Sequence, residues 1–464
     1  MNRASRICCL AIVGVSAAVF PTRFHAYPSV YPTGTTIYQP DKAWSGYTIF
    51  DTIDEQGAVL IDMNGNVLRL FTEITAVPSP SRILPGGYVV GGDMPREPHQ
   101  ESIALIQIDW EGREVWRFDR TEEVKTEDGD MVWASRLHHD WQREGNPVGY
   151  YAPGMEPETD RGRTLILAHK NVSKPEITDK LLEDDFIIEV SWDGEILWEW
   201  LASDHVDEFG FSEDARNAIY RSVNVNKERQ TADWLHINSA SYLGPNKWYD
   251  AGDERFRPDN IIVSARNASF IAIIDRSGSI VWRLGPDYTE SKALSELGQI
   301  IGQHHPHIIP KGLPGAGNLM VFDNGGSAGY GWANPASPDG TNALRRDSSR
   351  VLEINPVTLE KIWEYSVSGI EHIRFFSHYV SNTQRLPNGN TMINEGAIGR
   401  IFEVTKEGEI VWEYVSPYFG KEIRTRNTIY RAHRVPYEWI PQLARPEERP
   451  VVPPDLREFH VPTQ

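Results

Sequence analysis

The stretch RIFEVTKEGEIVWEY (residues 400–414) consists of two apolar runs joined by a turn at Gly408, with a tryptophan in the second run. Apolar residues alternate with polar ones on both sides of the turn, which is typical of a β-hairpin. Five other segments repeat this pattern: GAVLIDMNGNVLRLF (57–71), IALIQIDWEGREVWRF (103–118), FIIEVSWDGEILWEW (186–200), FIAIIDRSGSIVWRL (270–284) and RVLEINPVTLEKIWEY (350–365). The chain therefore contains six copies of one predicted hairpin.

A tryptophan occupies the same place in five of the six hairpins, and the first hairpin has Leu68 there. Because the position recurs, we interpret these side chains as packing between repeated sheets rather than as ligand-binding groups. The five are Trp116, Trp198, Trp282, Trp363 and Trp412.

A second strand pair precedes most hairpins and is marked by a Pro or Gly turn beside an apolar run, as in SRILPGGYVVGG (81–92) and RLPNGNTMINEG (385–396). Four strands per repeat predict an all-β fold, a six-bladed β-propeller with long inter-strand insertions. Two of these insertions, residues 202–226 and 290–301, are expected to hold short helices. The segment YRAHRVPYEW (430–439) is expected either to complete the first blade or to fold over the channel.

The chain of 464 residues divides into three predicted parts. Residues 1–26 read as a secretory signal peptide, because Arg3 and Arg6 precede an apolar run that is too short to span a bilayer. Residues 27–440 form a single propeller domain, and residues 441–464 form a Pro-rich C-terminal tail. The protein is therefore expected to be periplasmic or secreted, without membrane insertion after signal cleavage.

Cysteine content and charge exclude several functions. Both cysteines, Cys8 and Cys9, lie in the signal segment, so the mature chain has no thiol nucleophile, thiolate metal site or disulfide. The formal net charge of −19 argues against nucleic acid as a partner, because phosphate binding requires a basic face. An anionic small substrate would need a locally basic site.

Histidines recur in the predicted inner strands. The segments are SRLHHDW (135–141), DWLHINSA (233–240), GQHHPHII (302–309), FSHYVSNT (376–383) and YRAHRVPY (430–437). The first strand of each propeller blade lines the central channel, so imidazoles distant in sequence are expected to converge there. The inner-strand histidines are His138, His139, His236, His304, His305, His307, His378 and His433, and all but His138 are taken as candidate site residues.

Converging imidazoles have three chemical uses, and the spacing does not choose among them. Neutral rings bind transition metals, one ring can act as nucleophile or general base, and charged rings recognise an anion. The sequence contains no HExxH, CxxC or GxSxG motif that would decide the matter.

At DWLHINSASYL, GQHHPHIIP with NLMVFDNG, SRVLEINP and the ending GRIFEVTKEGEIVWEY, the chain resembles the bacterial arylsulfotransferase family, over roughly residues 40–440. These are periplasmic aryl-sulfate sulfotransferases that need no PAPS cofactor. The resemblance implies a six-bladed propeller whose channel transfers a sulfuryl group from a phenolic sulfate to a phenol through a sulfated histidine. The implied partners are a small aryl sulfate and a phenol.

The resemblance also implies roles for individual residues. His236 matches the histidine of the family's DWxHxN motif, with Asn238 beside it, and His305 matches the next histidine. The family arginine that follows the FDNG turn has no counterpart, and the nucleophilic histidine aligns with Arg400. Arginine stays protonated and cannot be that nucleophile.

Arg400 is therefore expected either to grip a sulfate with its planar guanidinium or to pair with a carboxylate such as Glu395. In the first case His378 or His139 would receive the sulfuryl group or take the phenol proton. The predicted catalytic residues are His236, His305, His378 and Arg400, and the predicted substrate-binding residues are His139, His304, His307, His433 and Asn238.

Two other functions remain open at this point. In a metal-dependent polysaccharide lyase the same histidines would hold a divalent ion, so a divalent metal is not excluded. A non-catalytic binding propeller would explain the absence of the expected histidine at Arg400. A homodimer is also left open.

Overall fold

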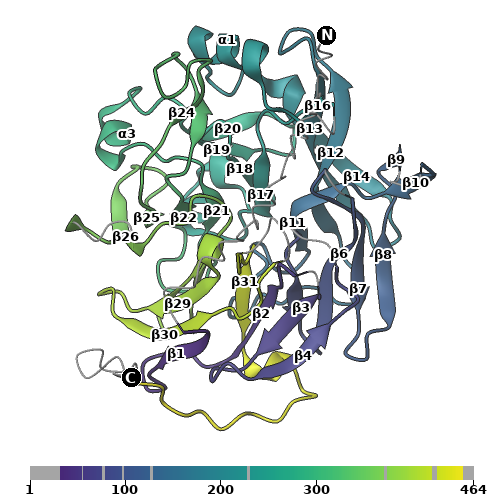
Figure 1. The fold of residues 1–464 in the computed structure, drawn as a ribbon, viewed down its shortest axis with the longest axis vertical. Helices are drawn as coiled ribbons and strands as arrows, with labels where there is room; N and C mark the ends of the chain where they lie inside the picture. The colour runs from purple at the N-terminus through teal and green to yellow at the C-terminus, as the bar shows by residue number, and fades with distance from the viewer. Residues whose placement is uncertain are drawn as a thin grey trace, which may run out of the picture.

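A computed structural model describes residues 32–452 except residues 55, 76–78, 97–98, 126–128, 227–229, 370–373 and 421–425. The predicted signal peptide, with both cysteines, lies outside the described residues, as do residues 453–464 of the tail. The described chain is an all-β propeller, with β-sheets arranged around a centre (Figure 1). Its described α-helices are α1 (Glu213–Ser222), α2 (Lys247–Asp250) and α3 (Lys292–Leu297). α1 and α3 lie in the two insertions predicted to be helical.

Four of the sheets are separate blades. The first has the order β31 (Ala432–Val435), β2 (Tyr47–Asp51), β3 (Ala58–Ile61), β4 (Val67–Phe71). The second runs from β17 (Ile237–Tyr242) through β18 (Ile261–Ala265) and β19 (Phe270–Ile274) to β20 (Ile280–Leu284). The third is β21 (His304–Ile308), β22 (Leu319–Asp323), β25 (Arg350–Ile354), β26 (Lys361–Tyr365). The fourth has five strands: β27 (Asn382–Arg385), β28 (Thr391–Glu395), β29 (Arg400–Val404), β30 (Ile410–Val415) and β1 (Gly34–Tyr38).

The remaining repeats share one ten-stranded sheet, so the prediction of six separate blades is wrong and the fold has four. Leu137 pairs with Ser102 and thereby joins two four-stranded units into one sheet. One unit is β5 (Arg82–Leu84), β6 (Tyr88–Arg96), β7 (Glu101–Ile108) and β8 (Glu114–Phe118). The other is β11 (Leu137–Arg143), β12 (Thr164–Ser173), β13 (Leu181–Val190) and β14 (Ile196–Leu201), extended by β15 (Val225–Asn226) and β16 (Thr231–Ala232). The short pairs β9 (Glu122–Lys125)/β10 (Met131–Ala134) and β23 (Ala328–Tyr330)/β24 (Thr341–Leu344) lie outside these sheets.

All six predicted hairpins form, as the last two strands of each four-stranded unit. The first strand of each hairpin is buried on both faces, as in β19 and β29, because the neighbouring sheets cover it on both sides. The second strand is partly exposed where it lies at the outer edge, as in β8, whereas β30 is almost fully buried because β1 pairs with it on the outer side.

The recurrent tryptophans join neighbouring units, as predicted. Each indole Nε1 donates to a backbone carbonyl in the hairpin turn of the next repeat. Trp412 donates to Met63 O at 2.7 Å and so links the last hairpin to the first. The other bonds are Trp116 to Trp192 (2.8 Å), Trp198 to Arg276 (3.2 Å), Trp282 to Pro356 (2.9 Å) and Trp363 to Lys406 (2.7 Å).

Both ends of the described chain close the ring. β31, from the segment YRAHRVPYEW, pairs antiparallel with β2 and completes the first blade rather than folding over the channel. β1 pairs antiparallel with β30 of the last blade. Within the described part of the chain, no helix is long and apolar enough to cross a membrane.

Candidate functional site

The inner strands β11, β17, β21 and β31 lie around the middle of the ring (Figure 1) and bring histidines together there. The first set, called here the His236 group, consists of His138, His139, His169 and His236. The ring of His139 lies edge-on to that of His236, with centroids 4.7 Å apart. His138 and His139 join through their Nδ1 atoms at 2.8 Å, and His138 stacks on His169 with centroids 3.6 Å apart. His169 from β12 is a member that the sequence analysis did not single out.

A second set, the His433 group, consists of His305, His307 and His433. The centroids of His305 and His307 are 4.6 Å apart, and those of His305 and His433 are 6.2 Å apart. His307 Nε2 bonds to the hydroxyl of Tyr150 at 2.9 Å. Both ring nitrogens of His305 and of His433 are buried without a hydrogen-bond partner among the described residues. The structure therefore places five of the seven predicted histidines in these two groups, and His304 and His378 lie in neither.

Buried arginines and one aspartate lie between the two groups. Asp140 accepts from Arg82 at 2.6 Å and pairs with Arg431 at 2.9 Å, and all three side chains are at most 1% exposed. Arg431 also donates to the backbone carbonyl of Asn238 at 2.7 Å. The side-chain amide of Asn238 donates to Gln303 O at 2.8 Å, so Asn238 connects two inner strands. These contacts hold the centre of the ring together.

Replacing Asp140 with asparagine should destabilise the protein strongly. The substitution keeps the shape of the side chain but leaves Arg82 and Arg431 without their shared carboxylate in a fully buried place. Breaking such a buried pair costs about 3–5 kcal/mol. Denaturant unfolding measures the loss, and Asp109→Asn, which removes an ion pair to the exposed Arg113, is the matched control and should change little. Equal stability of Asp140→Asn and the wild type would contradict this reading of the network.

A single amide fixes two of the predicted site residues relative to each other. Oδ1 of Asn324 accepts from Nδ1 of His304 at 2.8 Å. Nδ2 of the same amide donates to the carbonyls of Ser377 (2.6 Å) and Val380 (2.9 Å), which flank His378. His378 was expected in an inner strand but lies ahead of β27, in the turn that Asn324 holds. Asn324 belongs to the VFDNG motif, which was the sequence signal for it.

His236 has its own carboxylate partner. Its Nδ1 bonds to Oδ2 of Asp233 at 2.5 Å, which leaves Nε2 free to accept a proton. The backbone N–H of Arg266 donates to His236 O at 3.2 Å, so the loop after β18 packs against this histidine. Asp233 and Arg266 were not among the predicted residues, although Asp233 is the first residue of the DWLHIN motif.

The charge of Arg266 acts on both His304 and His378. Burial lowers the pKa of His304 well below its usual value, and Arg266 lowers it further. Burial also lowers the pKa of His378, together with the charges of Arg426 and Arg266. Because its pKa is lowered, His378 is a neutral imidazole at neutral pH. It is only partly buried, so solvent reaches the ring. The charge of Arg266 therefore acts on both rings, although Arg266 precedes the FDNG turn in the sequence.

We call this third assembly, which shares His236 with the first group, the His378 site: Asp233, His236, Arg266, His304, Asn324 and His378. It combines a partly exposed neutral imidazole, a carboxylate–imidazole pair and a guanidinium. These are the components that a group-transfer reaction on an anion requires: a nucleophile, a proton acceptor and a charge-neutralising donor.

The backbone at these histidines is strained. His139, His236 and His305 have positive φ angles of 59°, 53° and 52°. Strands β11, β17 and β21 each contain a register break near these residues. Non-glycine residues in this conformation cost about 1–3 kcal/mol each and cluster at functional sites. Sequence patterns that assume regular strands do not reveal such bulges.

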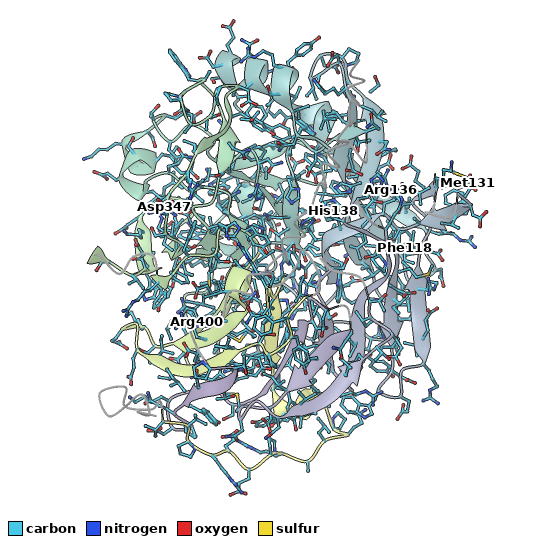
Figure 2. The ribbon with its side chains drawn as sticks, in the orientation of Figure 1. Phe118, Met131, Arg136, His138, Asp347 and Arg400 are labelled. Carbon is cyan, nitrogen blue, oxygen red and sulfur yellow. The ribbon has the colours of Figure 1, made fainter. Side chains whose placement is uncertain are left out.

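Arg400 occupies a different place. It lies at the start of β29, where Nε donates to Glu413 at 2.6 Å and Nη1 donates to Glu395 at 3.0 Å, and its guanidinium covers the ring of Phe402. Figure 2 shows Arg400 in its own blade, well apart from His138 near the centre. Of the two roles expected for Arg400, pairing with a carboxylate such as Glu395 is the one that these contacts form.

The fold and this site define a β-propeller with a histidine- and arginine-lined centre. The arylsulfotransferase family model matches residues 156–431, which is more than half of the chain. The chain belongs to the arylsulfotransferase family. No curated protein sequence matches it.

Solved propeller-like structures are similar only at a distance. A protein of unknown function from Bacteroides caccae is 11% identical, with 84% of this chain and 99% of that chain covered and a TM-score of 0.41. A virginiamycin B lyase from Staphylococcus aureus is 12% identical, with 84% and 86% covered and a TM-score of 0.33. A structure named as a putative 6-phosphogluconolactonase from Bacteroides fragilis is 12% identical. The match covers 86% of this chain and 100% of that chain, with a TM-score of 0.34.

Proposed function

We propose that this protein transfers a sulfuryl group from a phenolic sulfate ester to a phenol, and that the His378 site carries the reaction. Family membership supports transferase chemistry in general terms. Three observations carry the proposal: His378 is partly exposed, the charge of Arg266 acts on both His378 and His304, and Asn324 links His304 to the turn that holds His378.

In the first half-reaction a ring nitrogen of His378 attacks the sulfur of the donor. The S–N bond forms as the S–O ester bond breaks, and the electron pair stays on the departing phenolate oxygen. Arg266 neutralises charge on the sulfuryl oxygens, as fixed donors do in other transfer sites. His236 enters this half-reaction as an imidazolium stabilised by Asp233, and its Nε2 proton passes to the departing oxygen, which leaves as the phenol.

In the second half-reaction an acceptor phenol enters. Its proton goes to Nε2 of His236, its oxygen forms the new S–O bond, and the S–N bond to His378 breaks. The enzyme returns to its starting protonation state, so the same pair of groups serves both halves. Neither PAPS nor another cofactor takes part in this scheme.

The test uses p-nitrophenyl sulfate with and without a phenol acceptor. Release of nitrophenol that depends on the acceptor, together with formation of the sulfated acceptor, would support transfer. Release without an acceptor would indicate hydrolysis instead, and no release under any condition would contradict the proposal.

Replacing Gly326 with alanine should lower turnover without unfolding the protein. A Cβ at Gly326 would collide with the backbone carbonyl of His378, so the turn that carries this ring must shift. A displacement of about 1 Å in a reacting group costs on the order of 10²-fold in rate. Gly331→Ala is the matched control, because a Cβ there meets no atom within 4 Å. Steady-state kinetics on both variants decide the matter, and equal kcat for the two would show that the position of His378 is irrelevant.

A further inference from the structure

Three side chains on neighbouring strands of the ten-stranded sheet converge beside the His378 site. They are His138 on β11, His169 on β12 and Asp185 on β13. His169 and Asp185 are direct cross-strand partners, so they project from the same face of the sheet. His138 stacks on His169, and all three residues are at most 4% exposed. One donor atom from each lies within 4.8 Å of the donor atoms of the other two.

From this arrangement we infer that His138, His169 and Asp185 form a binding site for one divalent first-row transition metal ion, of which Zn²⁺ is the test case. The donor set is two imidazole nitrogens and one carboxylate oxygen, which suits such an ion better than Mg²⁺ or Ca²⁺, since these prefer oxygen ligands. This inference does not depend on the proposed sulfuryl transfer.

The separation of the donor atoms matches metal coordination. Nε2 of His138 lies 3.5 Å from Oδ1 of Asp185, which is too long for a hydrogen bond. Two ligand atoms at ~2.1 Å from a tetrahedral metal ion are ~3.4 Å apart. Nε2 of His138 is also buried and has no hydrogen-bond partner among the described residues. A metal ion bound by both Nε2 of His138 and Oδ1 of Asp185 would account for the unpaired nitrogen and for the distance between the two atoms.

The outer contacts orient these ligands for a metal. Nδ1 of His169 bonds to Glu101 at 3.0 Å, which leaves Nε2 of His169 as the free nitrogen. Glu101 is itself held by Arg136 at 2.7 Å. Ligating histidines typically have a carboxylate on the other ring nitrogen in this way. Nδ1 of His138 is likewise occupied, by His139.

The charge around Asp185 also favours a cation. Among the hydrogen bonds of the described residues, its two carboxylate oxygens accept only from the backbone N–H of Ile237, at 3.0 and 3.1 Å. None of the described lysines or arginines forms an ion pair with it, whereas Asp140 and Glu101 each have arginine partners. A bound divalent ion would balance this buried carboxylate.

Three protein ligands leave an open coordination position. His138 also packs against His139, whose ring lies edge-on to that of His236, so the ion would lie near these two histidines. The site would therefore be a catalytic-type site, able to hold water or a substrate oxygen, rather than a closed structural one.

The test uses tag-free full-length protein, incubated with ZnCl₂, desalted and analysed for metal content, with titration calorimetry for affinity. We expect one retained zinc per chain and a rise in Tm on adding zinc. Asp185→Asn and His138→Gln should each weaken zinc binding by at least tenfold and abolish the rise in Tm. His433→Gln, which alters another buried histidine without partners, is the matched control and should bind zinc like the wild type.

Failure of the wild type to retain zinc, or retention by Asp185→Asn equal to that of the wild type, would overturn the assignment. Circular dichroism establishes whether the variants are folded. If they are not, the zinc content and Tm shift of the wild type still decide the question. MgCl₂ in excess should not displace the zinc, and displacement by magnesium would overturn the choice of a transition metal.

Discussion

His378→Ala should lower acceptor-dependent nitrophenol release by on the order of 10³-fold or more, because it removes the group that bonds to sulfur. The ring is half-buried in a turn, so its loss creates no closed cavity and the fold should persist. The kinetic loss should appear in kcat, while the cationic neighbours still bind the donor. Steady-state assays with p-nitrophenyl sulfate measure it.

A covalent intermediate gives a more direct measurement. Wild-type protein quenched during reaction with donor alone should carry one added SO₃ group on the peptide that contains His378. His378→Ala should carry none, and His205→Ala, which alters a histidine stacked on the outer-strand Trp200, should react like the wild type. A modified peptide elsewhere, or full activity of His378→Ala, would exclude His378 as the nucleophile.

Because its pKa is lowered, His378 should remain neutral and reactive below pH 6.5, where an exposed histidine is already half-protonated. Protonation in acid removes the nucleophilic lone pair, so kcat should fall only below the usual histidine range. The same assay, run from pH 8 to pH 5, checks this.

Acid should destabilise the fold through the buried histidines. Burial, together with the charge of Arg431, lowers the pKa values of four histidines. Those of His304, His305 and His433 lie well below the usual value, and that of His307 is about 4. These rings stay neutral in the fold but gain protons when the chain unfolds below pH 6.5. Their stabilising contribution is therefore complete above pH 6.5 and is lost as the pH falls toward the folded-state values.

Each such histidine contributes a loss on the order of 1 kcal/mol at pH 5.5. Asp51 and Asp184 act in the opposite direction, because burial raises their pKa to about 7 and about 6 and their protonated forms stabilise the fold in acid. The unfolding free energy should thus fall between pH 7.5 and pH 5.5 by less than the sum of the four histidine contributions. Denaturant unfolding at the two pH values measures it.

His433→Leu isolates one of these contributions. The variant should take up about one proton fewer on unfolding at pH 5.5, so its stability should depend less on pH than that of the wild type. An unchanged pH dependence would mean that His433 is protonated in the fold, contrary to its burial beside Arg82 and Arg431.

Much of the fold could be predicted from the sequence because its determinants are local. The alternation and short turns of the six hairpins depend on neighbouring residues, and all six form. The recurrence of Trp412 and its equivalents also indicated packing between repeats. The number of separate sheets did not follow, because the single pairing of Leu137 with Ser102 depends on how two units approach each other in space.

The candidate site was predictable only in part. Histidine-rich inner strands indicated convergence, and the imidazoles do meet at the centre. Their division into two groups, the strained φ angles at His139, His236 and His305, and the distant position of Arg400 have no signal in the spacing of residues. Asp185 and His169 were missed because their strands read as ordinary buried sheet.

The repeating hairpin, its tryptophan contacts and the gathering of imidazoles could be predicted, since each follows from short-range sequence patterns and their repetition. The charges and amides that act on each ring depend instead on the fold. The charge of Arg266 acts on His304 and His378 although no motif joins them, and the amide of Asn324 links His304 to the turn that holds His378. The physical reason is that electrostatic and hydrogen-bond partners are set by distance in space, and strand bulges and blade packing determine that distance.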